Sequence, residues 1–395
     1  DADGHIRSSA ALIPQTWLYD GIPFGVGQLE AVGTDPACRR RGLARQVIAA
    51  LHDLSTACGH HVQAIMGMPW FYRQFGYEYA LDLGGLYHLP VSRLPALLPG
   101  ETERYQCRPA VEEDLTTIQR RHDAFFEDYM VTTQMDEALW QYHLAGHSRG
   151  SMLETRLFVV VNADGAVVGY YQTAANLRGT ALYVMALALA DGVSYYDVLP
   201  AVLRALREQG QTYAAAQTAR ARRDTLAARR PGEPPPPPPR KKALTDIAFE
   251  LGREHPVYQV LGRRLERPQK PYAWYLRVPD VAAFILHIAP ALEERLANSV
   301  MSGYSGGLAL NFYRDGLRLA FEDGKIVDAA HLDLAQANEG PDAAFPPLVF
   351  LKLLFGYRAL AELRESFPDC WARDEAALLL NILFPRRPSW ITDVG

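Results

Sequence analysis

Val32-Gly33-Thr34-Asp35-Pro36-Ala37-Cys38-Arg39-Arg40-Arg41-Gly42-Leu43-Ala44 is the stretch of sequence that decides the fold of the first part of the chain. Its extended start ends at Pro36, because proline interrupts a strand. Three arginines and Gly42 follow as a turn. From there, apolar residues recur with the spacing of one helix face, at Leu43, Val47, Ala50, Leu51 and Leu54. The stretch therefore predicts a strand, a basic glycine turn and an amphipathic helix, in that order.

The segments on either side of this stretch extend the pattern. Ile6 to Leu12 and Thr16 to Leu18 are expected to be strands, and a turn at residues 21–23 leads into the strand that ends before Pro36. Val62 to Met66 is a further short strand. It should run parallel to the strand before the turn, because a helix separates the two. We therefore predict a strand–helix–strand unit.

The basic turn has the features of an anion site. A turn placed where a helix begins directs several backbone N–H groups and the positive end of the helix dipole at one spot, which suits a diphosphate. Gly42 allows close approach of the backbone, and the arginines can add charge-assisted hydrogen bonds. A solvated helix end is the alternative interpretation, and a run of arginines alone does not decide between them.

Bulk properties restrict the class of protein. The 395 residues are enough for two or three compact units, and a composition that is 49% hydrophobic and 22% charged is that of a globular protein. A net charge of −5 gives no overall field that would attract nucleic acid or an anionic membrane, so neither is an expected partner. Four cysteines lie far apart, which predicts reduced thiols and no metal. No run approaches the roughly 20 apolar residues of a membrane helix, and no signal peptide opens the chain, so a cytoplasmic location is expected.

Two further units follow the first. The second shows a hairpin pattern, Leu157 to Val161 and Ala166 to Tyr171 around an Asp-Gly turn, and then a strand from Leu182 to Leu189 and a helix from Val198 to Leu206. The link between that strand and helix, residues 190–194, lacks the arginines of the first unit. The third should contain a helix from Val281 to Leu296, strands between 308 and 327 and helices between 347 and 383. We place the units at 1–100, 101–275 and 276–395.

A Pro-rich basic loop at 220–242 interrupts the second unit, with six consecutive prolines from Pro234 to Pro239. Proline imposes an extended, unpacked chain there. A solvated surface excursion is the interpretation that we favour. A basic tether for nucleic acid or a proline-groove partner is the alternative.

The motif at 32–44 resembles the acyl-CoA fingerprint of the GNAT N-acetyltransferase superfamily. Phe71-Tyr72-Arg73-Gln74-Phe75-Gly76-Tyr77 resembles a later GNAT motif, in the correct order. The resemblance implies that acetyl-CoA binds and that the amine attacks it directly in a ternary complex. It implies that Tyr72 protonates the departing thiolate, which a phenol of pKa near 10 can do. The implied cofactor-binding residues are Val32, Gly33 and Thr34 for the pantetheine arm and thioester, and Arg39, Arg40, Arg41, Gly42, Leu43, Ala44 and Arg45 for the diphosphate.

Over its whole length the chain looks like the enhanced intracellular survival (Eis) proteins, a group of aminoglycoside acetyltransferases. The run from Pro271 to Asp280 is typical of that group. The implied fold class is α/β (α+β): tandem GNAT folds, the first apparently truncated at its N-terminus, and then a sterol-carrier-protein-like α+β domain. The implied acceptor is a primary amine of a cationic small molecule, aminoglycoside-like or polyamine-like, or of lysine. A homo-oligomer, such as a hexamer, is also implied.

In the Eis group the terminal carboxylate acts as the general base, and here that would be Gly395, with Glu30 as a substitute. Two departures bear on this. The chain ends Ile391-Thr392-Asp393-Val394-Gly395 where the group has an aromatic end. The first unit also begins at what should be its central hairpin, so either the chain is truncated or another segment replaces the missing strands and helices.

Three sets of residues allow two interpretations. His60-His61 could suggest a metal, although a surface loop explains them better. Trp70, Phe71, Phe75 and Tyr77 could line an acceptor pocket or pack in a core. Apolar residues of the third unit could line a lipid cavity or form an ordinary core, namely Phe284, Ile285, Leu292, Phe350, Leu353, Leu354 and Phe355. The alternative function is accordingly an inactive GNAT scaffold that binds a lipid or partner through its C-terminal domain.

Overall fold

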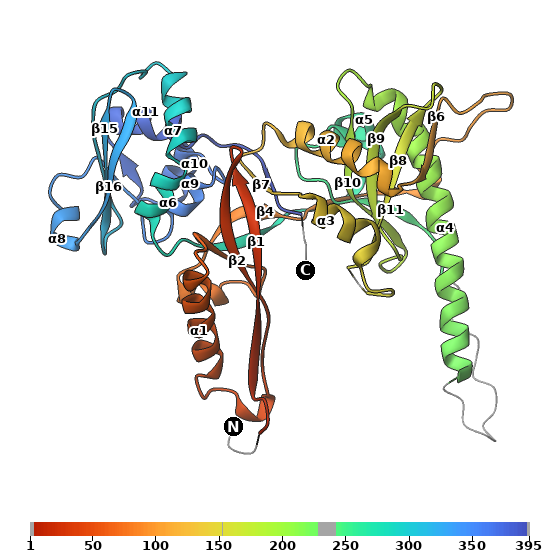
Figure 1. Ribbon diagram of the computed structural model, residues 1–395, viewed down its shortest axis with the longest axis horizontal. Helices are drawn as coiled ribbons and strands as arrows, with labels where there is room; N and C mark the ends of the chain where they lie inside the picture. Colours follow the sequence, from red (N-terminus) through yellow and green to blue (C-terminus); the bar gives the residue numbers. More distant parts are fainter. Residues whose placement is uncertain (1–3, 152, 228–241, 393–395) are drawn as a thin grey trace. The chain divides into compact units, whose positions relative to one another are not determined.

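The computed structural model describes residues 4–151, 153–227 and 242–392. Contacts group the chain into two compact units (Figure 1). Unit 1 contains the described residues of Asp1–Leu83, Glu127–Gln134 and Ala273–Asp393, and unit 2 contains those of Gly84–Phe126 and Met135–Tyr272. The units by contact are therefore discontinuous in sequence, and the division at 1–100, 101–275 and 276–395 stays a prediction.

Unit 1 contains a seven-stranded sheet in the order β19-β7-β1-β2-β3-β13-β4. Its β2 runs antiparallel to β1 and parallel to β3. Helix α1 (Leu43–Ala57) connects β2 to β3, so the predicted strand–helix–strand unit is confirmed. The strands are β1 (Ser8–Tyr19), β2 (Ile22–Thr34), β3 (Val62–Ile65), β4 (Glu78–Leu83), β7 (Val131–Thr133), β13 (Tyr272–Arg277) and β19 (Ser389–Trp390).

The two strands expected before residue 19 are one continuous strand, so that part of the prediction is wrong. Pro14 lies within β1, opposite Gly27 of β2. On its other side β1 pairs with β7 only from Trp17 to Tyr19. Pro14 therefore lies where β1 is an edge, and a strand tolerates the missing N–H of proline at an edge.

The two faces of this sheet pack against different parts of the chain. Helix α1 and the 3-10 helix η2 (Phe71–Phe75) cover one face, with Ile48 and Tyr72 in a core shared with Leu29. Residues from the C-terminal third cover the other. The rings of Phe24 and Phe284 lie 5.3 Å apart there, and both belong to the largest core cluster. Helices after residue 280 thus pack on this second face of the sheet.

The C-terminal part of unit 1 is an α+β arrangement with a five-stranded sheet in the order β16-β15-β14-β17-β18. Its strands are β14 (Gly306–Asn311), β15 (Gly316–Glu322), β16 (Lys325–Leu332), β17 (Ala343–Ala344) and β18 (Trp371–Ala372). Its helices are α6 (Val281–His287), α7 (Ala289–Ala297), α8 (Leu334–Ala337), α9 (Phe350–Leu354), α10 (Leu360–Ser366) and α11 (Asp374–Leu383). The likeness to sterol carrier proteins stays a prediction.

The structure bears on two predictions for this part of the chain. The single helix predicted from Val281 to Leu296 is wrong, because it divides into α6 and α7. Pro290 lies in the first turn of α7, where its missing N–H costs nothing, but it could not continue α6. The seven candidate lipid-cavity residues, among them Phe284 and Leu354, all belong to the buried core, which favours the packing interpretation.

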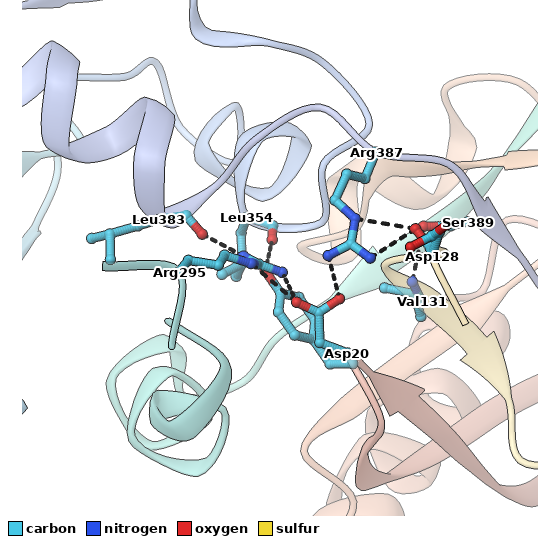
Figure 2. A network of polar contacts seen from close by, with 9 residues as sticks. Asp20, Asp128, Val131, Arg295, Leu354, Leu383, Arg387 and Ser389 are labelled. Atoms are coloured by element: carbon cyan, nitrogen blue, oxygen red, sulfur yellow. Dashed lines mark hydrogen bonds and ion pairs between the residues drawn. The ribbon is translucent and has the colours of Figure 1, made fainter. Parts of the chain in front are cut away.

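Asp20, in the turn between β1 and β2, joins three segments of unit 1 (Figure 2). Its carboxylate accepts hydrogen bonds from Arg295 of α7, at 2.5 and 3.0 Å, and from Arg387, at 2.7 Å. Arg387 also donates to the carbonyl oxygen of Asp128, just before β7. The side chains of Asp20 and Arg295 are 17% and 12% exposed, so this ion pair is mostly shielded from water. The network thereby fixes β7 and the chain before β19 at the β1 edge of the sheet.

Unit 2 contains a second seven-stranded sheet, in the order β12-β5-β11-β10-β9-β8-β6. Its strands are β5 (Leu86–Pro90), β6 (Tyr105–Pro109), β8 (Thr155–Asn162), β9 (Val167–Ala174), β10 (Ala181–Leu189), β11 (Asp246–Phe249) and β12 (Glu266–Gln269). Its helices are α2 (Leu115–Phe126), α3 (Glu137–Gln141), α4 (Tyr195–Ala227) and α5 (Pro256–Leu261). The predicted hairpin is confirmed as β8 and β9, which pair antiparallel.

Helix α4 is much longer than the predicted Val198–Leu206 (Figure 1). It extends to Ala227, so the first residues of the basic loop assigned to 220–242 are helical and that assignment is wrong for them. The proline run lies outside the described residues. Thr218 of α4 accepts a hydrogen bond from the Lys242 amide at 3.0 Å, which joins the segment that leads into β11 to this helix.

Three buried histidines of unit 2 predict a loss of stability at mildly acidic pH. Burial lowers the pKa of His122 to about 3 and those of His143 and His255 to about 4, from 6.5. The unfolded chain therefore binds protons that the folded chain cannot, and stability falls as pH drops from about 6.5 toward 4, by about 2 kcal/mol per histidine at pH 5. Urea unfolding between pH 7.5 and 5, followed by tryptophan fluorescence, measures this.

His143→Gln should reduce this pH dependence by the share of one histidine. A midpoint that does not move between pH 7.5 and 5 would contradict the assignment of neutral, buried imidazoles.

The Asp20 network predicts a second stability effect. Asp20→Asn keeps the shape but leaves Arg295 shielded from water and without its counter-charge, so unfolding in urea should become easier by roughly 3 kcal/mol. Asp323→Asn is a matched control, because Asp323 has nearly the same backbone φ (48° against 45°) in an exposed hairpin turn. Equal unfolding midpoints for the two variants would show that the network adds nothing to stability.

Candidate functional site

Strand β2 kinks just before the predicted cofactor turn. Ala31 has a φ of +52°, unusual for a residue with a Cβ, and the register with β1 shifts between Ser9 and Ala11. An extra residue on one strand of a pair is a β-bulge, which bends the strand that carries it. The pairing of β2 with β3 runs only from Val26 to Leu29. Residues 30–34 of β2, including the predicted Val32, Gly33 and Thr34, thus continue beyond their pairing with β3.

The turn after β2 presents a series of backbone N–H groups. Pro36–Cys38 form a 3-10 turn, Arg40 and Gly42 then take left-handed φ values of +62° and +76°, and α1 begins at Leu43. The first helical hydrogen bond runs from the Gln46 amide to the Gly42 carbonyl at 3.1 Å. Within the described part of the chain, the amides from Arg40 to Arg45 have no acceptor. This arrangement suits a phosphate group, because it joins open amides to the positive end of a helix dipole.

In the part of the chain that the structure describes, some arginine side chains of the turn are exposed without partners, and others contact neighbouring residues. Arg39 and Arg40 are exposed and have no side-chain partner among the described residues. Arg41 contacts the Cys38 sulfur at 3.7 Å. Arg45 donates to the Gln74 oxygen at 3.0 Å and lies over the Phe75 ring at 5.1 Å, and its role at the diphosphate stays a prediction. It therefore links the turn to η2.

Tyr72 lies on η2 among aromatic rings and is only 5% exposed. Its ring lies directly on Gly67, where an added Cβ would be 2.1 Å from a ring carbon. Burial raises the pKa of Tyr72, and the negative charge of Glu30 raises it further. The phenol thus stays protonated at neutral pH, as an acid must.

The other aromatic residues near Tyr72 have mixed roles. Tyr77 is fully buried and bonds His52 at 2.9 Å, so it belongs to the core. Trp70 is 63% exposed, with a left-handed φ of +63°, and its amide donates to the Tyr79 hydroxyl at 3.2 Å. Core packing is thus observed for Tyr77, whereas Trp70 lies at the surface. The acceptor-pocket interpretation stays a prediction.

A chain of polar side chains, which the sequence did not single out, leads to Glu30. Gln28 Nε2 donates to Glu30 Oε1 at 2.7 Å, and Gln15 donates to Gln28. Trp17 in turn donates its indole N–H to Gln15 at 2.7 Å. Gln28 is fully buried. The sequence feature that could have indicated this chain is a glutamine within a largely apolar strand, because a buried side-chain amide needs hydrogen-bond partners.

The C-terminal segment runs along the edge of the same sheet. β19 pairs in parallel with β7, and the Thr392 amide donates to the Thr133 hydroxyl at 2.9 Å. Thr133 is paired with Trp17 of β1. The last described residue is therefore near the polar chain that ends at Glu30. Gly395 itself lies outside the described residues, so its role stays a prediction.

In unit 2 a pair of parallel strands also stops pairing, and side chains of the protein make contacts at that point. The pairing of β10 with β11 ends at Val184, next to a register shift in β10. The buried His255 ring donates to the Leu187 carbonyl of β10 at 2.8 Å and contacts the Tyr195 ring. The Asp197 amide at the start of α4 donates to the Ser194 hydroxyl oxygen at 3.3 Å. That this unit is a degenerate copy of the first stays a prediction.

The family comparison matches the N-terminal part of the chain. Residues 1–80 match the model described as an acetyltransferase (GNAT) domain. This range includes β1–β3, the basic turn and Tyr72. A search by sequence among curated proteins finds no match.

Solved structures share the fold over nearly the whole length. A GCN5-related N-acetyltransferase from Anabaena variabilis matches with a TM-score of 0.64 and 13% identity, covering 98% of this chain and 87% of that one. One from Kribbella flavida gives 0.60 and 15%, covering 99% and 85%. Eis1 from Mycobacterium abscessus gives 0.58 and 14%, covering 98% and 87%. At these identities the likeness shows the fold, and the predicted α/β class with tandem GNAT-like sheets is confirmed.

The described residues also bear on two other features, a membrane-spanning helix and a metal site. None of their helices is long and apolar enough to span a bilayer. No group of three or more His, Cys, Asp or Glu in them is placed to hold a metal ion. His60 and His61 have other contacts: His60 bonds the Ser55 hydroxyl at 3.0 Å, and the His61 ring lies 4.1 Å from that of His287.

The turn geometry predicts that Gly42→Ala weakens acetyl-CoA binding by roughly tenfold, because a Cβ at a φ of +76° shifts the backbone that would approach the diphosphate. Isothermal titration calorimetry measures the Kd. Gly59→Ala is a matched control, since Gly59 has a φ of +77° and open space at the other end of α1. Equal losses of affinity in both variants would mean that general strain, rather than the phosphate turn, is responsible.

Proposed function

We propose that this protein transfers the acetyl group of acetyl-CoA to a primary amine. The observation that carries the proposal is the set of open amides from Arg40 to Arg45, at the end of a strand that has left its neighbour. GNAT domains use acetyl-CoA, and residues 1–80 match such a domain. The diphosphate would lie on the turn, and the pantetheine arm would follow residues 32–34 toward Tyr72.

The proposed reaction is a direct transfer in a ternary complex. The neutral amine attacks the thioester carbon, a C–N bond forms, and the carbonyl oxygen gains negative charge that backbone N–H groups of β2 can stabilise. The C–S bond then breaks, and its electron pair stays on sulfur. Tyr72 supplies the proton for that sulfur, and its raised pKa keeps the phenol loaded until it is needed.

A base must take the proton that the ammonium loses, since an amine of pKa near 10 is protonated at neutral pH. The Gly395 carboxylate is the first candidate, and the position of Thr392 beside Thr133 supports it. Glu30 is the second, because its charge acts on Tyr72.

The proposed acceptor is a cationic small molecule, aminoglycoside-like or polyamine-like, or a lysine side chain. The carboxylate of Glu30 supports this class, because it places a negative charge near Tyr72 and would attract an ammonium group. A homo-oligomer, such as a hexamer, and a cytoplasmic location remain predictions. We propose no metal, nucleic-acid or membrane partner.

Tyr72→Phe tests the acid. Removing the hydroxyl should lower kcat by roughly a hundredfold or more, with the Kd of acetyl-CoA nearly unchanged, because the phenol acts on the departing sulfur. Release of free thiol from acetyl-CoA, with polyamines, aminoglycosides and basic peptides as acceptors, measures the rate. Tyr77→Phe is the matched control, since it removes a hydroxyl from the same aromatic cluster.

The activity of the variant tests the role of Tyr72, and the activity of the wild type tests the proposed function. A Tyr72→Phe variant as active as the wild type would remove Tyr72 from the mechanism. Wild-type protein that neither binds acetyl-CoA nor forms acetylated product would reject the proposed function altogether. In that case the inactive scaffold that binds a lipid or partner would be favoured.

A further inference from the structure

A cavity of about 400 Å³ lies in unit 1 between η2 and the C-terminal part. One wall comes from Arg73, Gln74 and Gly76, which follow Tyr72 directly in sequence. The opposite wall comes from the turn between β14 and β15 and from the segment that leads into α9. This volume is within the range of small-molecule sites, and the residues that line the cavity do not include those from Val32 to Arg45.

The charged groups around the cavity are mostly positive. The lining contains two arginines, Arg73 and Arg314, against one carboxylate, Asp315. Within the described chain, Arg314 has neither an ion-pair nor a hydrogen-bond partner. His331 is held by Asp280 at 2.8 Å.

The buried Glu78 pairs with Arg73 of this wall. Its carboxylate lies 2.7 Å from Arg73 and 3.0 Å from Lys352, so it is shared between two basic groups. Of these two, only Arg73 lines the cavity. An anionic group that enters can approach Arg73 without displacing Glu78, because a guanidinium has five N–H donors.

Much of the remaining lining is apolar. Val281, Phe312 and Phe350 provide a hydrophobic wall, and the Phe312 and Phe350 rings stack with centroids 5.5 Å apart. Leu348 lines the cavity with a left-handed φ of +70°, a strained conformation that often marks ligand-binding segments. An apolar wall with a few charged groups at one side is the usual form of a site for an amphipathic small molecule.

We propose that this cavity binds a small organic anion with an apolar body, of the class of a medium-chain carboxylate. The anionic group lies between Arg314 and Arg73, and the apolar body lies against Phe312, Phe350 and Val281. This site is additional to the proposed acetyl-CoA site and does not depend on acetyl transfer.

Calorimetric titration of the full chain with octanoate tests the proposal, with octylamine as the cationic comparator. Octanoate should bind, and octylamine should not. Arg314→Gln should weaken octanoate binding by roughly tenfold, because it removes the unpaired cation. Arg318→Gln is the matched control, since Arg318 is exposed on the neighbouring β15 and does not line the cavity. Val281→Trp, which fills the apolar end, should abolish binding while the thermal unfolding transition stays cooperative.

Three results would overturn the proposal: no octanoate binding at millimolar concentration, equal binding of octylamine, or an Arg314→Gln variant that binds as the wild type does. Acetyl-CoA binding is measured on the same samples. Loss of octanoate binding with intact acetyl-CoA binding, or the reverse, shows which of the two sites fails.

Discussion

The candidate site depends on the point at which β2 stops pairing with β3. A strand inside a sheet uses its N–H groups on both sides, so a central strand has none to offer a ligand. The bulge at Ala31 and the end of pairing at Leu29 change this for the last residues of β2. The turn that follows then directs further open amides toward the same region. In unit 2 the pairing of β10 with β11 likewise ends at Val184, and there the His255 ring bonds the Leu187 carbonyl of β10.

Local patterns in the sequence predicted the first part of the site well. The apolar spacing after Gly42 and the short strand at Val62 each depend on neighbours in sequence, and the structure has both elements with the expected parallel pairing. The left-handed turn at Gly42 is equally local. The polar chain from Trp17 to Glu30 was not predicted, because its members are brought together by the β1–β2 register.

Long-range packing accounts for the errors and omissions. Nothing near residue 24 in sequence shows that Phe284 covers it, yet these rings form one core. The sequence also gave no sign that β13 pairs with β3, because a six-residue strand does not specify its partner. Helix α4 was predicted too short because its C-terminal half is polar. Contacts with residues distant in sequence, such as the hydrogen bond from Lys242 to Thr218, support that half of the helix.

The position of β13 has a consequence for biosynthesis. Strands β3 and β4 are joined in the sheet only through β13, which leaves the ribosome after the whole of unit 2. Until then, β3 and β4 each have an unpaired edge, and open strand edges favour aggregation. Completion of this sheet therefore waits for residues 272–277.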